Sequence, residues 1–300
     1  MDAGLVRIGT RGSVLARRQT DLVAASLRSR QLGVTVQIVP ITTSGDRSQH
    51  TNAPGPDWGS GVFVKELEEA LRSGAIDLAV HSLKDVPPEP TRGLVLVAFP
   101  TREDPRDVLL TADGRAFDAL EQRARVGTSS ARRSAFLRAA RPDLTFVPIR
   151  GNVDTRVRKL RAGEYDAIVL ARAGLRRLGT DVPHVVLEPD LLPPAPGQGA
   201  LAIQARADDV RVAQLVEPLD DRPTALAVRA ERRLMARLDG GCRLPVGALA
   251  IPGLDGTVSL LGAVANPDGS RVSKAWVEGR LDDLDRLVDS LADRLLGALV

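Results

Sequence analysis

The sequence predicts an α/β fold in which two related domains are followed by a small α+β domain. Three observations support this prediction. The 300 residues exceed what one hydrophobic core normally organises. Short β-branched runs alternate with amphipathic stretches, which is the order of βαβ units. The segment LRSGAIDLAV at 71–80 recurs as LRAGEYDAIV at 160–169, with Leu, Arg, Gly and Asp at the same spacing.

The first domain shows strand and helix patterns in alternation, divided by a Gly, Pro and Asn-rich loop at 44–61. Ser13 is placed to cap the first helix, and Gly74 to end the second. This order predicts a mostly parallel sheet with helices on its faces. The expected strands are 5–10, 34–43, 76–82 and 94–100, and the expected helices are 13–30 and 62–73.

The second domain repeats this theme: IGTRGS at 8–13 is echoed by VGTSSA at 126–131. Coincidence between two common strand-to-helix turns is the alternative explanation. The polar segment TREDPRD at 101–107 predicts a hinge with few contacts, and the strand within 192–206 could cross back to the first domain. The predicted boundaries are 1–100 with 198–217 for domain 1, 105–193 for domain 2 and 220–300 for domain 3.

The third domain is predicted to contain a helix at 224–238, several strands within 246–279 and a helix at 281–300. The only cysteine of the chain, Cys242, lies at its entrance in DGGCRLP. A lone cysteine is usually an inert buried thiol. Here the flanking glycines give a bulky group room, and nearby arginines would favour the thiolate, so a covalent attachment point is a second interpretation.

Composition excludes several classes of function. No apolar run approaches the roughly 18 residues of a membrane span, and we expect a cytoplasmic monomer without a signal peptide. One cysteine and three dispersed histidines predict no metal site. Acidic residues nearly balance basic ones at a net charge of +3, and aromatic residues make up 3%, so we expect no nucleic-acid partner.

Arginines gather where the predicted strands end, which indicates an anionic ligand in a cleft at the carboxyl ends of the strands. No nucleotide-binding glycine motif is present, so a polycarboxylate is favoured. The alternative is that these arginines merely reach into solvent. Lys84 and Asp85 follow another strand; Asp85 could stabilise a cation or move protons, or the two could form a simple Lys–Asp pair. His81 is more probable as a structural residue.

Taken together, these segments resemble the hydroxymethylbilane synthase family, also called porphobilinogen deaminase. The resemblance is carried by RIGTRGSVLA, FVKELEEALRSGAIDLAVHSLKDVP, REDPRDVLL, VGTSSARRSAFL, IRGNVDTRVRKL, YDAIVLARAGLRRLG, PGQGALAI and AERRLMARLDGGCRLPVGA, in that order. It implies two domains like a two-lobed type-II solute-binding protein with the active cleft between them, plus the third domain. It also implies a dipyrromethane cofactor on Cys242. Four porphobilinogens are added to this cofactor with loss of ammonia, and hydroxymethylbilane is released by hydrolysis.

The resemblance also implies residue roles. Asp85 would bind pyrrole N–H groups, stabilise the cation left when ammonia departs and assist proton transfer. The residues implied to face the substrate are Arg11, Ser13, Phe63, Arg150, Arg156 and Gln198. Those implied to hold cofactor carboxylates are Lys84, Ser130, Arg132, Arg133 and Arg177. Ser60 stands where the family commonly has lysine, which puts one lid contact in doubt.

Two other functions fit parts of the sequence. A non-enzymatic two-lobed protein that binds or senses a small molecule would share the fold, because a fold does not determine a function. An arginine-rich nucleic-acid binder would show affinity that falls steeply with salt. The third domain and the Gly-Gly-Cys loop argue against the first of these alternatives.

Overall fold

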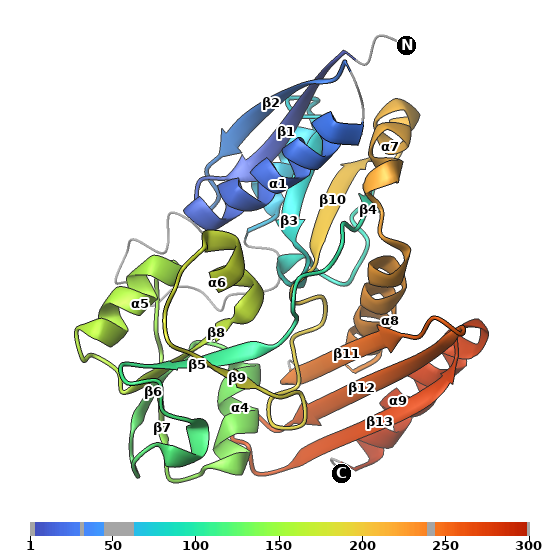
Figure 1. Cartoon of the computed structure of the whole chain (residues 1–300). Coiled ribbons are helices and arrows are strands. Elements are labelled where there is room, and N and C mark those ends of the chain that lie inside the picture. The colour runs from blue at the N-terminus through green and yellow to red at the C-terminus, as the bar shows by residue number, and fades with distance from the viewer. Residues whose placement is uncertain (1–3, 31–32, 45–62, 239–243, 299–300) are drawn as a thin grey trace. The chain divides into compact units, whose positions relative to one another are not determined.

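The computed structural model describes residues 4–30, 33–44, 63–238 and 244–298. The chain forms two compact units: unit 1 is Met1–Glu103 with Ala200–Ala225, and unit 2 is Asp104–Gly199 with Leu226–Val300. The strands of the described residues form three sheets, each flanked by helices, so the predicted α/β class is confirmed (Figure 1). Ser60 and Cys242 lie outside the described residues.

Unit 1 contains a mixed sheet in the order β2-β1-β3-β10-β4. Its strands are β1 (Leu5–Arg11), β2 (Thr35–Ile41), β3 (Leu78–Ser82), β4 (Leu94–Ala98) and β10 (Leu201–Arg206). Strand β1 is parallel to β2 and β3, whereas β10 is antiparallel to both of its neighbours. The prediction of a mostly parallel sheet holds for β1, β2 and β3, but the two pairings of β10 are antiparallel. The predicted return of the strand within 192–206 to the first sheet is confirmed.

Helices pack on both faces of the unit 1 sheet. These helices are α1 (Val14–Arg30), α3 (Lys65–Arg72) and α7 (Val210–Val216). On one face, α1 and α7 bury Leu27 and Val212 against Ile8 of β1. On the other face, α3 buries Leu67 and Leu71 beside Ile76 and Ala79. Burial of these apolar faces holds the helices against the sheet, in which the parallel strands β1, β2 and β3 end at the same edge.

Unit 2 repeats this arrangement with the strand order β7-β6-β8-β5-β9. Its strands are β5 (Asp107–Thr111), β6 (Arg125–Gly127), β7 (Thr145–Val147), β8 (Ala167–Ala171) and β9 (Val185–Leu187). Its helices are α4 (Ala131–Ala140), α5 (Val153–Arg161) and α6 (Arg172–Leu178). Strand β5 is antiparallel to β8 and β9, as β10 is to its neighbours in unit 1. The two sheets therefore share one topology.

Equivalent residues make equivalent contacts in the two sheets. A Cβ atom on Gly9 would lie 2.3 Å from Ile76, and one on Gly127 would lie 2.8 Å from Tyr165, the residue that aligns with Ile76. The aspartates of the repeated segment behave alike: Asp77 and Asp166 each accept the backbone N–H of the arginine at the start of β1 or β6, at 2.8 and 2.6 Å. The predicted internal repeat is confirmed, and coincidence does not explain it.

Unit 2 also contains an antiparallel sheet of β11 (Val246–Pro252), β12 (Thr257–Ala265) and β13 (Val272–Arg280), covered by α8 (Arg222–Leu238) and α9 (Leu284–Gly297) (Figure 1). A Cβ atom on Gly262 of β12 would lie within 3 Å of Leu234, Leu291 and Leu295, so glycine allows both helices to approach the sheet. The predicted elements of this region are confirmed. The three-domain division remains a prediction, since the division into units falls within α8.

The segment 101–107 contains the division between the two units, between Glu103 and Asp104, and its residues are bonded within each unit. Within unit 1, the backbone N–H of Arg102 donates to Thr224 at 3.0 Å. Within unit 2, Asp104 forms ion pairs with Arg106 and Arg172, and Asp107 is fully buried. A polar, proline-bearing segment resembles an exposed linker in sequence, but these charges are held internally. Among the described residues, no helix is long and apolar enough to cross a membrane.

Candidate active site

In unit 1, the end of β1 and the start of α1 place Arg11 and Ser13. Ser13 accepts the backbone N–H of Ala16 at 3.3 Å, so the predicted cap of this helix is confirmed. Arg11 is the last residue of β1 and is half-buried. The strand therefore ends with a cation beside the amino end of a helix, a combination that favours an anionic ligand.

Arg11 is held over an aromatic ring. Its guanidinium carbon lies 3.9 Å from the centroid of the Phe63 ring, the geometry of a cation–π contact. Both residues line a small cavity of about 20 Å³ together with Asp85, Gln19 and His81. The structure thus brings together three predicted site residues, Arg11, Phe63 and Asp85, which we call the Arg11 cluster.

Asp85 and Lys84 lie in a 3-10 turn, Leu83–Asp85, directly after β3. Val86 is extended at ψ 125°, as expected for a residue that precedes proline. The Asp85 side chain is half-buried, and within the described residues it has no hydrogen bond or ion pair. Its carboxylate is therefore available to a ligand donor. Lys84 is exposed.

His81 lines the same cavity as the Arg11 cluster and is held by a chain of hydrogen bonds. Its Nε2 lies 3.0 Å from Oε1 of Gln204, whose amide nitrogen donates to Glu68 at 3.0 Å. The Gln204 oxygen must therefore accept, so His81 carries its proton on Nε2. Burial lowers the pKa of His81 to about 4, against the weaker opposing effects of Gln204 and Glu68. His81 is neutral and buried, as expected of a structural histidine.

In unit 2, the turn between β6 and α4 is the counterpart of the turn before α1. Ser130 caps α4 by accepting the backbone N–H of Arg133 at 3.4 Å. Ser129 donates to the carbonyl of Ile149 at 2.8 Å and accepts its N–H at 3.1 Å. These bonds join the turn after β6 to the segment after β7, where Arg150 begins the next loop.

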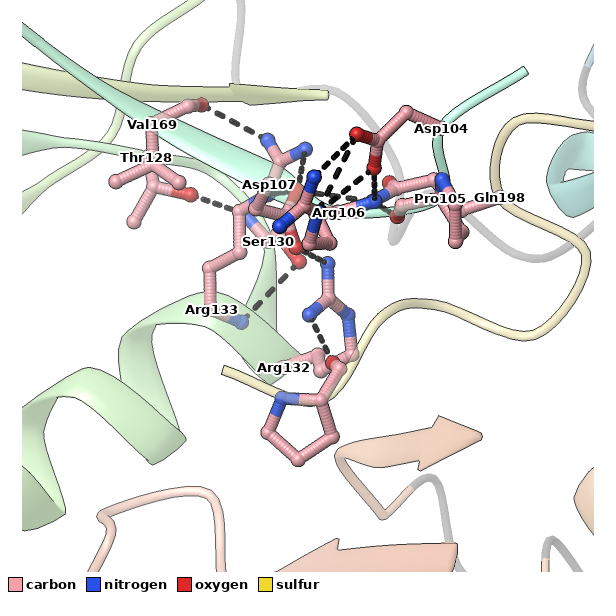
Figure 2. A network of polar contacts seen from close by, with 11 residues as sticks. Asp104, Pro105, Arg106, Asp107, Thr128, Ser130, Arg132, Arg133, Val169 and Gln198 are labelled. Atoms are coloured by element: carbon pink, nitrogen blue, oxygen red, sulfur yellow. Dashed lines mark hydrogen bonds and ion pairs between the residues drawn. The ribbon is translucent and has the colours of Figure 1, made fainter. Parts of the chain in front are cut away.

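Arg132 and Arg133 follow the cap and turn inward to a shared carboxylate. Arg133 donates Nε and Nη2 to Oδ1 of Asp107 at 3.0 and 2.7 Å, while Arg132 donates Nη2 to Oδ2 at 2.8 Å (Figure 2). The two arginines are only 6% and 7% exposed, and Asp107 is 0% exposed. Burial and the charge of Asp107 oppose each other at Arg132; burial is the larger effect, and the pKa of Arg132 is lowered. The alternative that these arginines reach into solvent is wrong.

Gln198 and Arg177 extend this arrangement. Gln198 donates Nε2 to Oδ1 of Asp107 at 3.1 Å and to the carbonyl of Pro105 at 2.7 Å (Figure 2). The glycines on either side of Gln198 have φ of +73° and +87°, a backbone conformation that favours glycine. Arg177 of α6 donates to the carbonyl of Gly199 at 2.6 Å. We call Asp107, Arg132, Arg133 and Gln198 the Asp107 cluster.

Arg156 lies near the Asp107 cluster. It donates Nε to the carbonyl of Gly151 at 2.8 Å, and within the described residues it has no ion pair with a carboxylate. Burial and the charge of Arg133 lower the pKa of Arg156 to about 10. Arg150 is half-buried at the end of the same segment. Asn152 occupies the cap position of α5, but its side chain makes no cap bond.

Asp107 is the residue that the sequence analysis missed as part of the site. It was assigned to a hinge, although it stands directly before the apolar run VLL, where a buried strand begins. An aspartate in a buried strand needs a cationic or hydrogen-bonding partner, and the sequence is rich in arginine. This signal could have been noticed; the identity of its partners depends on the order of strands in the sheet.

Two family models match the chain. The model described as the dipyromethane cofactor binding domain of porphobilinogen deaminase covers residues 6–214, and that of the porphobilinogen deaminase C-terminal domain covers 225–297. The chain belongs to the porphobilinogen deaminase family. Porphobilinogen deaminase of Roseiflexus sp. is 50% identical over 292 residues, 96% of this chain and 95% of its own length. That of Rubrobacter xylanophilus is 48% identical over 294 residues, 98% of this chain and 94% of its own.

Among solved structures, the chain is similar to the BenM effector binding domain with benzoate, at 12% identity and a TM-score of 0.44, over 72% of this chain and 90% of that one. The family, in contrast, is shown by sequence. The chain is accordingly an enzyme, a transferase of tetrapyrrole biosynthesis that polymerises porphobilinogen with a dipyrromethane cofactor.

Proposed function

We propose that the Arg11 cluster carries the reaction, that the arginines of the Asp107 cluster hold the carboxylates of the cofactor, and that Arg156 binds a carboxylate of the substrate. The observation that carries this proposal is the contrast in unpaired charge. Asp85 is a carboxylate without an internal partner, and Arg156 is a cation without one, among the described residues. Each is suited to a ligand of opposite character: a pyrrole N–H for Asp85 and a carboxylate for Arg156.

The residues of unit 2 fit a polycarboxylate. Two guanidiniums, those of Arg132 and Arg133, share a single carboxylate, Asp107, and the charge of Arg156 acts on Arg133, so the group keeps a net positive charge. A pyrrole of this pathway brings acetate and propionate side chains, which guanidiniums bind bidentately. We propose that Ser130, Arg132, Arg133 and Arg177 hold cofactor carboxylates in unit 2, and that Lys84 does so in unit 1.

We propose that the cofactor is attached through the sulfur of Cys242. When bound, the dipyrromethane supplies the pyrrole carbon to which substrate is added. Arginines near a cysteine in the sequence, here Arg237 and Arg243, favour the thiolate that such an attachment requires. Gly240 and Gly241 precede Cys242 and leave space for the attached rings.

Asp85 is the proposed catalytic residue. Its carboxylate oxygens accept the pyrrole N–H of the bound substrate and oppose the positive charge that develops as ammonia leaves. The same oxygens take and return protons during addition. Arg11 and Ser13 bind substrate carboxylate in unit 1, and Phe63 keeps the Arg11 guanidinium in one plane. Arg150, Arg156 and Gln198 are the proposed substrate contacts in unit 2.

We further propose that the enzyme works as a cytoplasmic monomer, without nucleic acid or a membrane. The interspersed acidic and basic residues and the net charge of +3 support the absence of a polyanionic partner. Light scattering coupled to size exclusion checks the oligomeric state: a mass near 32.0 kDa is expected, and twice that value would contradict the proposal.

The experiment that tests the proposed function compares the parent protein with Cys242→Ser. The parent is expected to consume porphobilinogen and release ammonia in equal amounts, and Cys242→Ser to do neither while it remains folded. Ser60→Ala is the matched control, since it removes a hydroxyl from another segment without touching the thiol. Binding of porphobilinogen without ammonia release would instead indicate the non-enzymatic binding protein.

A further inference from the structure

Arg132 and Arg133, which follow the α4 cap, are connected by hydrogen bonds to residues of unit 2 that lie beyond the proposed cofactor site. Asp107 forms ion pairs with both guanidiniums, and Gln198 donates a hydrogen bond to the same carboxylate at 3.1 Å. The residue before Gln198, Gly197, donates its backbone N–H to Glu231 of α8 at 2.7 Å. Glu231 is 0% exposed and also accepts the N–H of Ala250 of β11 at 2.9 Å.

These hydrogen bonds, together with the peptide bond between Gly197 and Gln198, connect the arginine pair to α8. Helix α8 ends at Leu238, and Cys242 follows it by four positions in the sequence. The path therefore runs from two proposed cofactor-binding arginines to the helix that precedes the proposed attachment residue. The side chains along this path are buried, and a buried hydrogen-bonding group is costly to leave without a partner.

The charge of Asp107 does not cancel the binding capacity of the arginines. One carboxylate faces two guanidiniums, and Arg156 adds a third cation near Arg133. Within the described residues, the hydrogen bonds of Arg132 use two of its five N–H groups, those to Asp107 and to the carbonyl of Pro193. Asp107 thus orients the guanidinium planes and leaves positive charge for an anion.

We infer that Asp107 is a positioning residue for cofactor binding, which fixes Arg132 and Arg133 and, through Gln198 and Glu231, links them to the helix that precedes Cys242. The inference rests on the proposed function. Asp107 itself does not touch the cofactor; it acts through the two arginines. Without it, the arginines remain buried but lose their fixed orientation, so the cofactor carboxylates meet cations that are not in place.

A second aspartate of the same segment provides a matched control. Asp104 is also shared by two arginines, Arg106 and Arg172, at 2.7 and 2.5 Å, and its side chain is 13% exposed. Neither of these arginines belongs to the proposed cofactor site. Asp107→Asn and Asp104→Asn therefore remove comparable ion pairs, and only the first should disturb cofactor binding.

The test measures cofactor loading and stability separately. Intact-protein mass spectrometry of the freshly purified parent, Asp107→Asn and Asp104→Asn gives the fraction that carries a covalent addition, and thermal unfolding gives the stability of each. We expect the ratio of loaded to unloaded protein to fall about tenfold in Asp107→Asn, the effect of losing charge-assisted hydrogen bonds, and to stay unchanged in Asp104→Asn. Unchanged or increased loading in Asp107→Asn, or an equal loss in both variants, would overturn the inference.

Two further measurements keep the test decisive. If Asp107→Asn does not fold, Gln198→Leu is used: a lower loaded fraction supports the inference, and full loading overturns it. In a double-mutant cycle, Asp107→Asn and Arg133→Ala should be non-additive, since one acts through the other. A parent protein that carries no covalent addition would instead reject the proposed function, so the two failures are distinguishable.

Discussion

The turn between β1 and α1 and the turn between β6 and α4 place their arginines in different environments. In unit 1, Arg11 stands before the Ser13 cap, lies half-buried over Phe63 and belongs to a small cavity with Asp85. In unit 2, Arg132 and Arg133 stand after the Ser130 cap and point into the protein, where Asp107 neutralises part of their charge. One repeated backbone thus supports two kinds of cationic site.

The position of the arginine relative to the cap explains the difference. A residue before the cap belongs to the strand end, where side chains line the edge of the sheet. Arg132 and Arg133, in the first turn of α4, are oriented toward the core, where a charge must be paired. The accessible arrangement suits an exchanging substrate, and the buried, internally paired arrangement suits a group that stays bound.

The largest expected effect is a loss of turnover without a loss of stability, on substitution of Asp85. Asp85→Asn should reduce turnover by on the order of 10²–10⁴, because an amide cannot take a proton or oppose a developing cation. Thermal stability should not change, since Asp85 has no internal partner among the described residues. Steady-state assays of porphobilinogen consumption measure this effect. Glu89→Gln, in the exposed segment that follows, is the control; near-normal turnover in Asp85→Asn would remove it from the mechanism.

The next effect concerns the stability of the fold in acid, which should depend on His81, a residue that lines the same cavity as the Arg11 cluster. The pKa of His81 is about 4 in the folded protein and near 6.5 when unfolded, so the unfolded state binds more protons between these values. The free energy of unfolding should therefore fall as pH drops from 6.5 to 4, by up to about 3 kcal/mol from this group. Urea titrations at each pH measure it.

The His81 prediction has a direct control. In His81→Gln the position no longer titrates, so the part of the pH dependence between 6.5 and 4 that belongs to this group should disappear. The same slope in the variant and in the parent would show that other groups cause the acid lability.

The smallest effect concerns the aromatic ring of Phe63, which contacts the Arg11 guanidinium. Phe63→Leu keeps apolar bulk but removes the cation–π contact, which is worth about 0.5–1 kcal/mol. KM should rise about two- to fivefold, with kcat and melting temperature unchanged. Phe146→Leu removes a second contact of this kind, in which Arg138 lies 5.3 Å from the ring centroid, and should leave KM unaltered. Equal effects in both variants would contradict the role of Phe63.

Much of the fold was predictable because the residues that recur in the two halves of the sequence make close structural contacts. Gly9 and Gly127 have no room for a Cβ atom, and Asp77 and Asp166 each accept the backbone N–H of an arginine in the neighbouring strand. Such residues are visible in a sequence as a spacing. The resemblance to the family then supplied the site residues, which spacing alone left open.

The Asp107 cluster was not predictable in the same way. Asp107 lies 25 and 26 residues from its two arginines in sequence, and they meet because β5 pairs antiparallel with β8. The sequence order of strands does not determine their order in a sheet.

The division of labour between the two clusters is the central claim, and one measurement tests it most directly. Intact mass and turnover are recorded together for Asp85→Asn and Arg132→Ala. We expect Asp85→Asn to be fully loaded and slow, and Arg132→Ala to be poorly loaded, by a factor that corresponds to roughly 1–3 kcal/mol, with turnover per loaded molecule much less reduced. Stoichiometric loading in Arg132→Ala, or poor loading in Asp85→Asn, would contradict the account.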